Sequence, residues 1–245
     1  MVKTDKGYAQ LFKIYGKSET ELKEKLGDIL KQTGNIMVST RRRGKEVHVL
    51  AEVAETDEET AKNQLKPVGK EIKKALGVMV YSTKENETME EAVVRLLAKY
   101  ELTVTTAESC TGGMIASKIV NVPGASDVFN EGFITYSNKA KRKILDVSKN
   151  TLKKYGAVSE QTAKEMALGG VFAADADACV AVTGVAGPDG GTEEKPVGLV
   201  YIACCIKDEV TVKECHFHGT RMEVREQSAN AALDLLRVSI LNNYR

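Results

Sequence analysis

Residues 105–113 have the sequence TTAESCTGG, and this stretch decides the fold around it. The segment 102–107 is short, β-branched and rich in threonine, which predicts a strand. After the two glycines, residues 114–120 have the apolar spacing of a helix. Ser109 is therefore expected in a tight turn between a strand and a helix. Such a turn is a suitable place for a nucleophile or an anion site.

The beginning of this helix offers hydrogen-bond donors to a ligand. The first N–H groups of a helix have no partner within it, and the helix dipole adds positive potential there. We expect Cys110, Thr111, Gly112 and Gly113 to bind a phosphate or the oxyanion of an attacked carbonyl. The simpler alternative is that Ser109 or Thr111 only caps the helix.

Two further segments combine unusual residues. Residues 132–141, GFITYSNKAK, predict a strand that ends in a capping pair and passes lysines into a helix. Residues 182–198, VTGVAGPDGGTEEKPVG, join two predicted strands, and their backbone N–H groups can cradle an anion because glycines leave little side chain in the way. The expected substrate-binding residues of this loop are Thr183, Gly184, Gly187, Gly190, Gly191 and Thr192.

These segments, with PGAS at 123–126 and YGAVSE at 155–160, resemble the C-terminal domain of the CinA family. The resemblance runs from about residue 88 to the end of the chain. Members of this family include stand-alone bacterial nicotinamide mononucleotide deamidases. The resemblance implies hydrolysis of the carboxamide of nicotinamide mononucleotide to nicotinate mononucleotide and ammonia.

Amide hydrolysis needs a nucleophile, a base that also protonates the leaving amine, and donors for the oxyanion. Ser109 is the expected nucleophile. The chain has three histidines, His48, His216 and His218, and all lie far from the motifs. This placement disfavours a Ser-His-Asp triad and favours a serine–lysine pair, in which burial lowers the pKa of the lysine.

The family pattern marks Lys141 as the base. Lys139 and Lys143 flank it and stay open as alternatives, and any of the three could instead be a solvated helix lysine. Tyr136, at the end of the predicted strand, is a second catalytic candidate, because it could relay a proton or stack on the pyridine ring. A packing role is the alternative for this tyrosine.

The neighbours of Ser109 raise two alternatives. Cys110 could be the nucleophile, because a thiol at a helix N-terminus has a lowered pKa. The family pattern assigns the reaction to the serine, so Ser109 is preferred. Glu108 is expected on the opposite face of the strand, where it either orients the loop or is exposed. Ala107 stands where the nucleophile elbow of α/β-hydrolases has its first glycine, which excludes that class.

The phosphate of the implied substrate needs local positive groups, because the formal net charge of the chain is only +1. Arg221 and Arg225 open the last predicted helix and lie four residues apart on one face. Arginine binds phosphate through two parallel hydrogen bonds, and the resemblance favours Arg225 over Arg221. Surface pairing with Glu223 or Glu226 is the alternative.

Residues 1–84 predict a small α+β domain separate from the domain of the motifs, residues 85–245. Strands at 10–15, 35–41, 45–53 and 78–82 and helices at 18–32 and 56–76 give the order β-α-β-β-α-β. This order resembles the KH-like middle domain of longer CinA proteins. Their N-terminal molybdopterin-binding-like domain has no counterpart, so we expect its pyrophosphatase activity to be absent, whether the chain is naturally short or a fragment.

The larger domain is expected to be a three-layer α/β unit with a mixed sheet. Its predicted strands, at 102–107, 128–136, 178–183, 197–206 and 209–217, alternate with helices. The last two strands are separated by a short link, which predicts an antiparallel hairpin.

Residues 41–45, RRRGK, form the strongest basic cluster of the chain, at the tip of a predicted hairpin. The first domain has no Gly-x-x-Gly loop, and no aromatic residue interrupts the cluster, so a solvated turn or a subunit contact is favoured over nucleic acid. A non-catalytic nucleotide- or nucleic-acid-binding module linked to competence or DNA damage remains the alternative function.

The composition is that of a globular enzyme, with 42% hydrophobic and 28% charged residues among 245. No apolar run reaches the length of a membrane span, and no leader is visible, so a cytoplasmic protein without membrane contact is expected. The five cysteines are odd in number, which predicts free thiols. Because Cys215 and His218 lack a second ligand pair, we expect no metal or cofactor. A homodimer or larger assembly is expected from the family resemblance.

Overall fold

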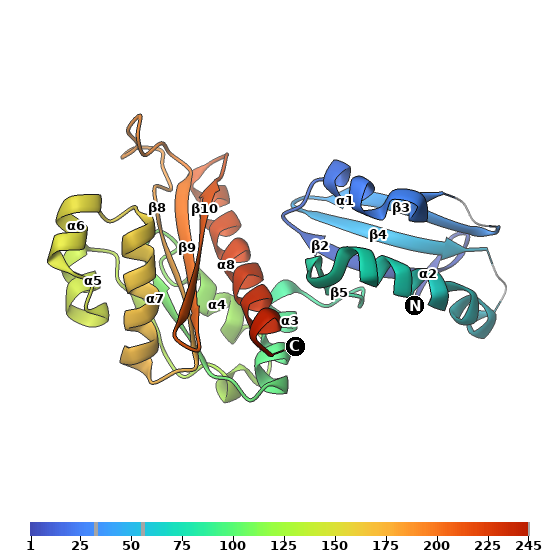
Figure 1. Ribbon diagram of the computed structural model, residues 1–245, viewed down its shortest axis with the longest axis horizontal. Helices are drawn as coiled ribbons and strands as arrows, with labels where there is room; N and C mark the ends of the chain where they lie inside the picture. The colour runs from blue at the N-terminus through green and yellow to red at the C-terminus, as the bar shows by residue number, and fades with distance from the viewer. Residues whose placement is uncertain (32–33, 55–56, 245) are drawn as a thin grey trace. The chain divides into compact units, whose positions relative to one another are not determined.

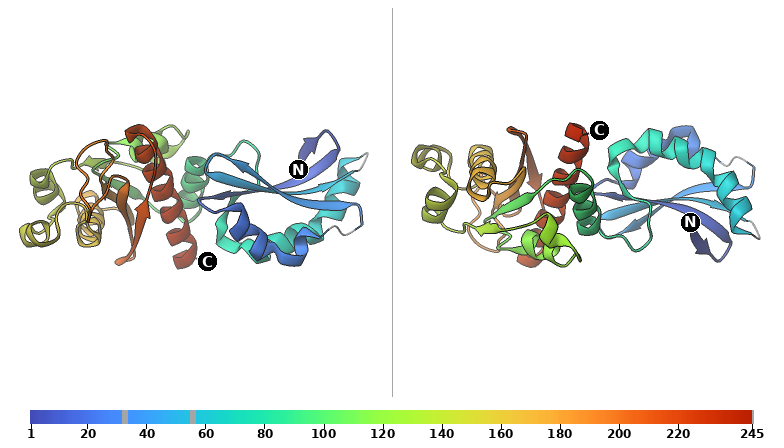
Figure 2. Two further views of the ribbon diagram at one scale, coloured as in Figure 1. Left: turned by 90° about the horizontal axis from the view of Figure 1, so that it is seen from above. Right: turned by 90° about the horizontal axis from the view of Figure 1, so that it is seen from below.

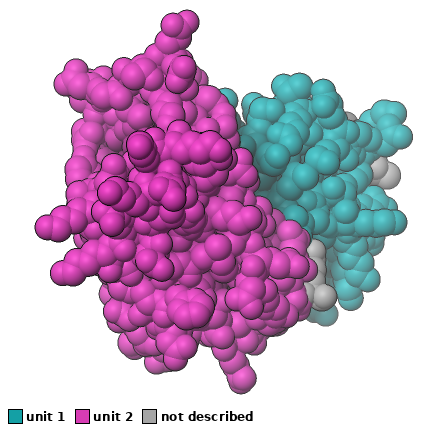
Figure 3. Space-filling model, turned by 60° about the vertical axis from the view of Figure 1, so that its left-hand side comes forward, with its two compact units in different colours: residues 1–88 teal, residues 89–245 magenta. Residues whose placement is uncertain are grey.

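The computed structural model describes residues 1–31, 34–54 and 57–244. It divides into two compact units, Met1–Thr88 and Met89–Arg245, which Figure 3 colours separately. Each unit has its own hydrophobic core and is described by itself. The helix ends that the sequence predicts at Gln32 and Thr56 lie outside the described residues.

The first unit is an antiparallel sheet with two helices on one face (Figure 2). Its strands are β1 (Val2–Thr4), β2 (Gly7–Tyr15), β3 (Ile36–Arg43), β4 (Glu46–Val53) and β5 (Val80–Ser82), in the order β1-β2-β4-β3 with β5 beside β2. Its helices are α1 (Glu19–Leu26) and α2 (Glu58–Leu76), each followed by a 3-10 turn, η1 (Gly27–Leu30) and η2 (Gly77–Met79). The predicted element order is confirmed, with β1 as an additional strand.

Alternation along β4 decides which face of this sheet is covered. Val47, Val49, Ala51 and Val53 are buried in one core with residues of α1 and α2, because alternate side chains of a strand point to the same face. Ser18 and Asp57 cap the two helices, each accepting a hydrogen bond from a backbone N–H of the first turn.

The second unit has a five-stranded mixed sheet between two helical layers (Figure 1). The strand order is β10-β9-β8-β6-β7, with bounds β6 (Val104–Glu108), β7 (Gly132–Ile134), β8 (Ala178–Gly184), β9 (Leu199–Ile206) and β10 (Glu209–His216). One layer holds α3 (Met89–Lys99), α4 (Met114–Val120) and α8 (Arg221–Tyr244), and the other α5 (Asn138–Leu145), α6 (Lys149–Tyr155) and α7 (Glu160–Ala174). The predicted three-layer fold with a mixed sheet is confirmed.

The central strands are buried along almost their whole length because helices cover both faces of the sheet. Every residue of β6 is buried, and β6 runs parallel to both β7 and β8. The hairpin of β9 and β10 turns through Lys207 and Asp208, whose φ angles of 50° and 62° fit a type I′ turn.

The predicted strand 128–136 is shorter than expected. Residues Ala125–Asp127 form a 3-10 turn, η3, and only Gly132–Ile134 pair as β7. The strand ends early because Ser137 accepts a hydrogen bond from the N–H of Ala140 and so begins α5 at once. Within the described residues, no helix combines the length and apolar character that crossing a membrane requires.

Candidate active site

Ser109 and Lys141 meet beyond the C-terminal end of β6. Ser109 directly follows the strand, and its N–H donates to the carbonyl of Val182 in the neighbouring strand β8 at 3.0 Å. The Nζ atom of Lys141 lies 2.8 Å from Ser109 Oγ and 2.8 Å from the carbonyl oxygen of Thr135. Lys141 has no exposed surface, and Ser109 is 8% exposed. The structure thus brings together the predicted nucleophile and the predicted base.

The helix α5 separates Lys141 from the two alternative lysines. Lys141 and Leu145, four residues apart, are its buried residues and face inward together. Lys139 and Lys143 are exposed. Of the three candidates, only Lys141 is therefore placed beside Ser109.

Burial changes the proton affinity of Lys141. Loss of solvent lowers the pKa of its ammonium group from 10.5 to about 8, because the charged form is the one that water stabilises. At pH 7, roughly a tenth of this side chain is then neutral and able to accept a proton.

The pKa of the Cys110 thiol differs from the sequence-based expectation. Burial raises the pKa of Cys110 to about 11, and the charge of Glu108 acts in the same direction. The expected lowering of this pKa by the helix N-terminus is therefore wrong. The thiol stays protonated at neutral pH, which leaves Ser109 as the better placed nucleophile.

Glu108 occupies the N-terminus of α4 from inside the protein. Its carboxylate is fully buried and accepts hydrogen bonds from the N–H groups of Gly113 at 2.9 Å, Ile115 at 3.1 Å and Ala116 at 2.9 Å. An exposed Glu108 is thus excluded. The sequence had assigned these helix N–H groups to an anionic ligand, but the chain supplies its own anion because β6 ends directly beneath the helix.

The turn keeps two backbone donors. The N–H of Gly112 donates to the carbonyl of Ser109 at 3.2 Å. Apart from the thiol of Cys110 itself, no described residue accepts a hydrogen bond from the N–H of Cys110 or Thr111. The hydroxyls of Thr111 and Thr135 are also buried without a partner in that part of the chain. The N–H groups of Cys110 and Thr111, in the turn that directly follows Ser109, are the backbone donors available to an oxyanion.

The two arginines of α8 reach different segments. Arg225 donates to the carbonyls of Cys110 (Nε, 3.1 Å) and Thr111 (Nη2, 2.8 Å), so it braces the turn that carries Ser109. Arg221 is exposed and donates to the carbonyl of Gly187 at 2.6 Å and to the hydroxyl of Tyr136 at 3.3 Å. Tyr136 is 64% exposed, so it lies at a rim and not in the core.

Glu223, which the sequence offered as a surface partner of the two arginines, caps the beginning of α8. Glu223 accepts hydrogen bonds from the N–H and the hydroxyl of Thr220, at 2.7 and 2.9 Å. This contact caps the beginning of α8, as expected of an acid three residues after a threonine.

The glycine-rich loop is anchored at both ends. The hydroxyl of Thr183 donates to the carbonyl of Ala157 at 2.8 Å, and Gly184 ends β8 where a Cβ would lie 2.7 Å from the carbonyl of Leu199. At the other end, the N–H of Thr192 donates to the carbonyl of Lys195 at 2.9 Å. Gly190 and Gly191 are exposed at the tip, while Gly187 is buried under Arg221.

The cysteines offer no second reactive centre. All five are buried, and none forms a disulfide. Within the described ranges, no group of three or more His, Cys, Asp or Glu side chains is arranged to hold a metal ion.

The comparison with protein families identifies both units. The model of the CinA C-terminal domain matches residues 86–240, and that of the damage-inducible protein CinA KH domain matches residues 9–82. The chain belongs to the CinA family. Similar curated CinA relatives include a putative competence-damage inducible protein of Caldicellulosiruptor saccharolyticus, 43% identical over 238 residues, and a CinA-like protein of Kosmotoga olearia, 44% identical over 234 residues.

These alignments cover 97% and 96% of the CinA chain described here, but 58% and 57% of the relatives. The chain thus spans less than two thirds of their length. Among solved structures, a competence/damage inducible protein of Agrobacterium tumefaciens has a TM-score of 0.59 at 40% identity, covering 64% of this chain and 99% of its own. A CinA superfamily protein of Escherichia coli has a TM-score of 0.59 at 37% identity, covering 66% and 98%.

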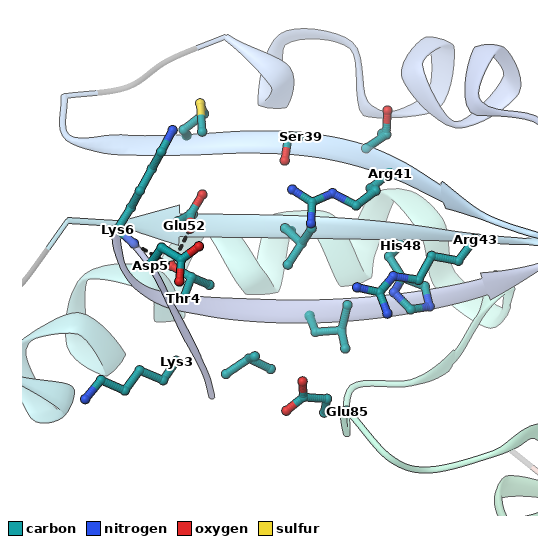
Figure 4. Close-up of a pocket in the computed structure, with 15 residues that line it drawn as sticks. Lys3, Thr4, Asp5, Lys6, Ser39, Arg41, Arg43, His48, Glu52 and Glu85 are labelled. Atoms are coloured by element: carbon teal, nitrogen blue, oxygen red, sulfur yellow. Dashed lines mark hydrogen bonds between the residues drawn. The ribbon is translucent and has the colours of Figure 1, made fainter.

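The KH-like unit of this CinA chain has a hollow on the sheet face away from its helices, with a volume of about 570 Å³. Figure 4 shows Arg41, Arg43 and His48 toward one end of it and Asp5 and Glu52 toward the other. No phenylalanine, tyrosine or tryptophan is among the described residues that line it. A face without aromatic rings offers no platform on which bases can stack.

Proposed function

We propose that the second unit hydrolyses the carboxamide of nicotinamide mononucleotide, giving nicotinate mononucleotide and ammonia. The observation that carries the reaction class is the 2.8 Å contact between Ser109 Oγ and the Nζ of a buried lysine whose pKa is lowered to about 8. A serine beside such a lysine is a nucleophile with its base. The substrate follows from the resemblance of the motifs to the CinA deamidases.

Neutral Lys141 has two N–H bonds and one lone pair. One N–H donates to the carbonyl of Thr135, and the lone pair accepts the hydroxyl proton of Ser109. Ser109 Oγ then forms a bond to the carboxamide carbon, and the carbonyl electron pair moves onto the oxygen. The N–H groups of Cys110 and Thr111 are the donors for this oxyanion.

The intermediate collapses with the help of the same lysine. The Lys141 ammonium gives its proton to the amide nitrogen, the carbon–nitrogen bond breaks, and ammonia leaves a nicotinoyl ester on Ser109. Water then loses a proton to Lys141 and attacks the ester. Ser109 Oγ leaves and takes the proton back, so one water is consumed for each ammonia released.

We assign the phosphate end of the substrate to Arg221 and the loop at Gly187. Arg221 is exposed at the rim beside Tyr136, whose ring is free to contact a pyridine or ribose. Arg225 has two of its nitrogens on the carbonyls of the turn, so we assign it the positioning of Ser109. This assignment reverses the preference that the sequence gave to Arg225.

The buried pair of Ser109 and Lys141 supports an enzyme better than it supports a non-catalytic binding module. A lysine without exposed surface lowers stability while it is charged, and a binding protein gains nothing from placing it on a serine hydroxyl. The names of the relatives, putative competence-damage inducible protein and CinA-like protein, state neither a substrate nor a reaction.

The direct test is ammonia release from nicotinamide mononucleotide by the purified chain, with nicotinate mononucleotide identified as the product. Ser109→Ala should lose turnover by several orders of magnitude yet still bind the substrate, because the donors of the turn and the arginines remain. Release by the unmutated chain no faster than by Ser109→Ala would exclude the proposed function.

Substitution of Arg221 and of Arg225 should change different kinetic constants. Arg221→Ala should raise KM for the mononucleotide by at least about tenfold while changing KM for nicotinamide riboside little, since the riboside lacks the phosphate. Arg225→Ala should lower kcat for both compounds, because the turn loses its brace. Equal effects of Arg221→Ala on both compounds would remove this residue from the phosphate site.

A further inference from the structure

The uncovered face of the sheet in the first unit carries two arginines of β3. Arg41 lies opposite His48 of β4 in the register of the two strands. Arg43 lies opposite Glu46, two residues before His48. Val47, between these two β4 residues, is buried in the core under the helices, so Glu46 and His48 point to the uncovered face. Directly opposed residues of an antiparallel pair share a face, so Arg41 and Arg43 lie there together (Figure 4).

The guanidinium groups of these arginines are unpaired within the part of the chain that the structure describes. No hydrogen bond or ion pair joins Arg41 or Arg43 to any residue there. The nearby carboxylate of Glu46 is already engaged, because one oxygen accepts a hydrogen bond from the Tyr81 hydroxyl at 2.7 Å and the other lies 3.0 Å from Nε2 of His48. Each guanidinium has five N–H donors, so the pair is open to an anion from solution.

The two arginines border a hollow of about 570 Å³, a volume within the range of small-molecule sites. Leu50 comes next after His48 along the uncovered face of β4, because alternate residues of a strand share a face. Glu85 also lines the hollow, and it forms no ion pair with Arg41 or Arg43 in the described chain. The hollow is therefore basic at the end of the arginines and apolar in its middle.

The far end of the hollow carries both signs of charge. Asp5 and Glu52 lie there in Figure 4, together with Lys3 and Lys6. One oxygen of Glu52 accepts a hydrogen bond from the hydroxyl of Thr4, and the described residues supply none to the other oxygen. An end with donors and acceptors side by side suits hydroxyl groups, which both donate and accept hydrogen bonds.

We propose that this hollow binds a sugar phosphate, with the phosphate on Arg41 and Arg43 and the sugar hydroxyls at Glu52. A phosphate monoester carries nearly two negative charges at neutral pH, and guanidinium groups bind it through parallel hydrogen bonds. The C–H side of the sugar packs on Leu50, between the two polar ends. The site lies in the first unit and shares no residue with the proposed reaction, so it does not depend on that reaction.

A nucleic-acid strand fits the hollow less well than a sugar phosphate. None of the described residues that line it is aromatic, so bases would have no ring on which to stack. The volume is also limited to a small molecule, whereas a strand would extend beyond both ends.

The first test is a titration of the full, isotope-labelled chain with ribose 5-phosphate, followed by amide proton–nitrogen correlation spectra. The amide resonances of residues 39–43 and 48–52 should shift and saturate at millimolar concentration or below. Amides beside Ser109 are read in the same spectra, so binding at the proposed active site is measured separately. Inorganic phosphate should bind the first unit at least about tenfold more weakly, because it makes no contact at the far end.

Arg42 provides the matched control for the two arginines. It lies between them in the chain but on the other face of β3, and its Nε donates to the carbonyl of Gly44 at 3.1 Å. Arg41→Gln and Arg43→Gln should each raise the Kd of ribose 5-phosphate at least about tenfold, because each removes a charge-assisted contact. Arg42→Gln removes the same charge from the chain and should change this Kd by less than about twofold.

The far end of the hollow is tested by Glu52→Gln. Glutamine keeps an oxygen for the Thr4 hydroxyl but loses an acceptor for the sugar. The Kd of ribose 5-phosphate should rise about fivefold, while the Kd of inorganic phosphate should stay within about twofold. The amide spectrum of each variant also shows whether the first unit is folded.

Three results would overturn the proposal. The first is the absence of a saturating shift at these amides up to about 10 mM ribose 5-phosphate. The second is an equal loss of binding in Arg42→Gln, which would assign the basic hairpin to a polyanion such as nucleic acid. The third is inorganic phosphate that binds as tightly as ribose 5-phosphate, which would leave an anion site without a place for the sugar.

Discussion

The burial of Lys141 affects both the proposed chemistry and the stability of the second unit. Its ammonium group contacts a hydroxyl and a carbonyl, and it has no exposed surface. Neutral partners of this kind compensate only in part for lost water, so the folded chain favours the uncharged lysine. The same burial that prepares a base therefore weakens the fold while the lysine is protonated.

The free energy of unfolding should therefore depend on pH through the ionisation of Lys141. Between pH 8 and 10.5 the unfolded chain binds a proton at Lys141 that the folded chain has lost, so the contribution of Lys141 to the free energy of unfolding rises with pH. The lowering from 10.5 to about 8 corresponds to roughly 3 kcal/mol. The free energy of unfolding of Lys141→Met should therefore lack this contribution, so the difference between the variant and the unmutated chain in urea unfolding should change between pH 8 and 10.5.

The exposed Lys143 provides the matched control for that measurement. Lys143→Met should unfold with the same pH dependence as the unmutated chain. Parallel curves for Lys141→Met and the unmutated chain would contradict the burial of a charged lysine at this position.

At the scale of elements, the strand β6 and the helix α4 are held together by one carboxylate. Glu108 is the last residue of β6, and it satisfies three N–H groups at the beginning of α4. Gly113 makes the connection possible, because it enters the helix with a φ of 91°, which a side chain disfavours. The position of Ser109 between the two elements follows from this contact.

Removal of that carboxylate should loosen α4. Glu108→Ala leaves the buried N–H of Ile115 and the partly buried N–H groups of Gly113 and Ala116 without this acceptor, and it should lower the free energy of unfolding by about 2 kcal/mol. Glu108→Gln keeps an oxygen for Gly113 and Ile115, and it should lose less. The exposed Glu131→Ala is the control. A Glu108→Ala variant as stable as Glu131→Ala, in chemical denaturation, would contradict the role of the cap.

At the scale of the whole molecule, the two units have separate cores and separate family matches. The two solved structures of Agrobacterium tumefaciens and Escherichia coli named above are covered almost entirely by about two thirds of this chain. The reacting residues that we propose all come from the second unit. The first unit contributes none of them.

The second unit should therefore fold and react alone. A chain of residues 86–245 should unfold in one cooperative transition and release ammonia from nicotinamide mononucleotide with the kcat of the full chain. Thermal unfolding and the ammonia assay measure both properties. A fall in kcat of more than about tenfold in a folded second unit would show that the first unit takes part in catalysis.

The sequence by itself determined the two-part organisation, the family and most of the strand and helix order. These follow from local patterns: the alternation in β4, the buried run of β8 and the serine caps are each written in a few neighbouring residues. The motifs also pointed to Ser109 and Lys141, which are 32 residues apart in the chain. No spacing rule brings them together, so their contact was known only as a family expectation.

Only the tertiary structure decided which hydrogen-bonding groups of the site remain available to a ligand. Glu108 is an ordinary acid in the sequence, and only the packing of α4 above the end of β6 turns it into a buried cap. The roles of Arg221 and Arg225 likewise depend on which carbonyl each guanidinium reaches across the fold. Burial and hydrogen-bond partners arise from residues distant in the chain, which is why local sequence patterns could not assign them.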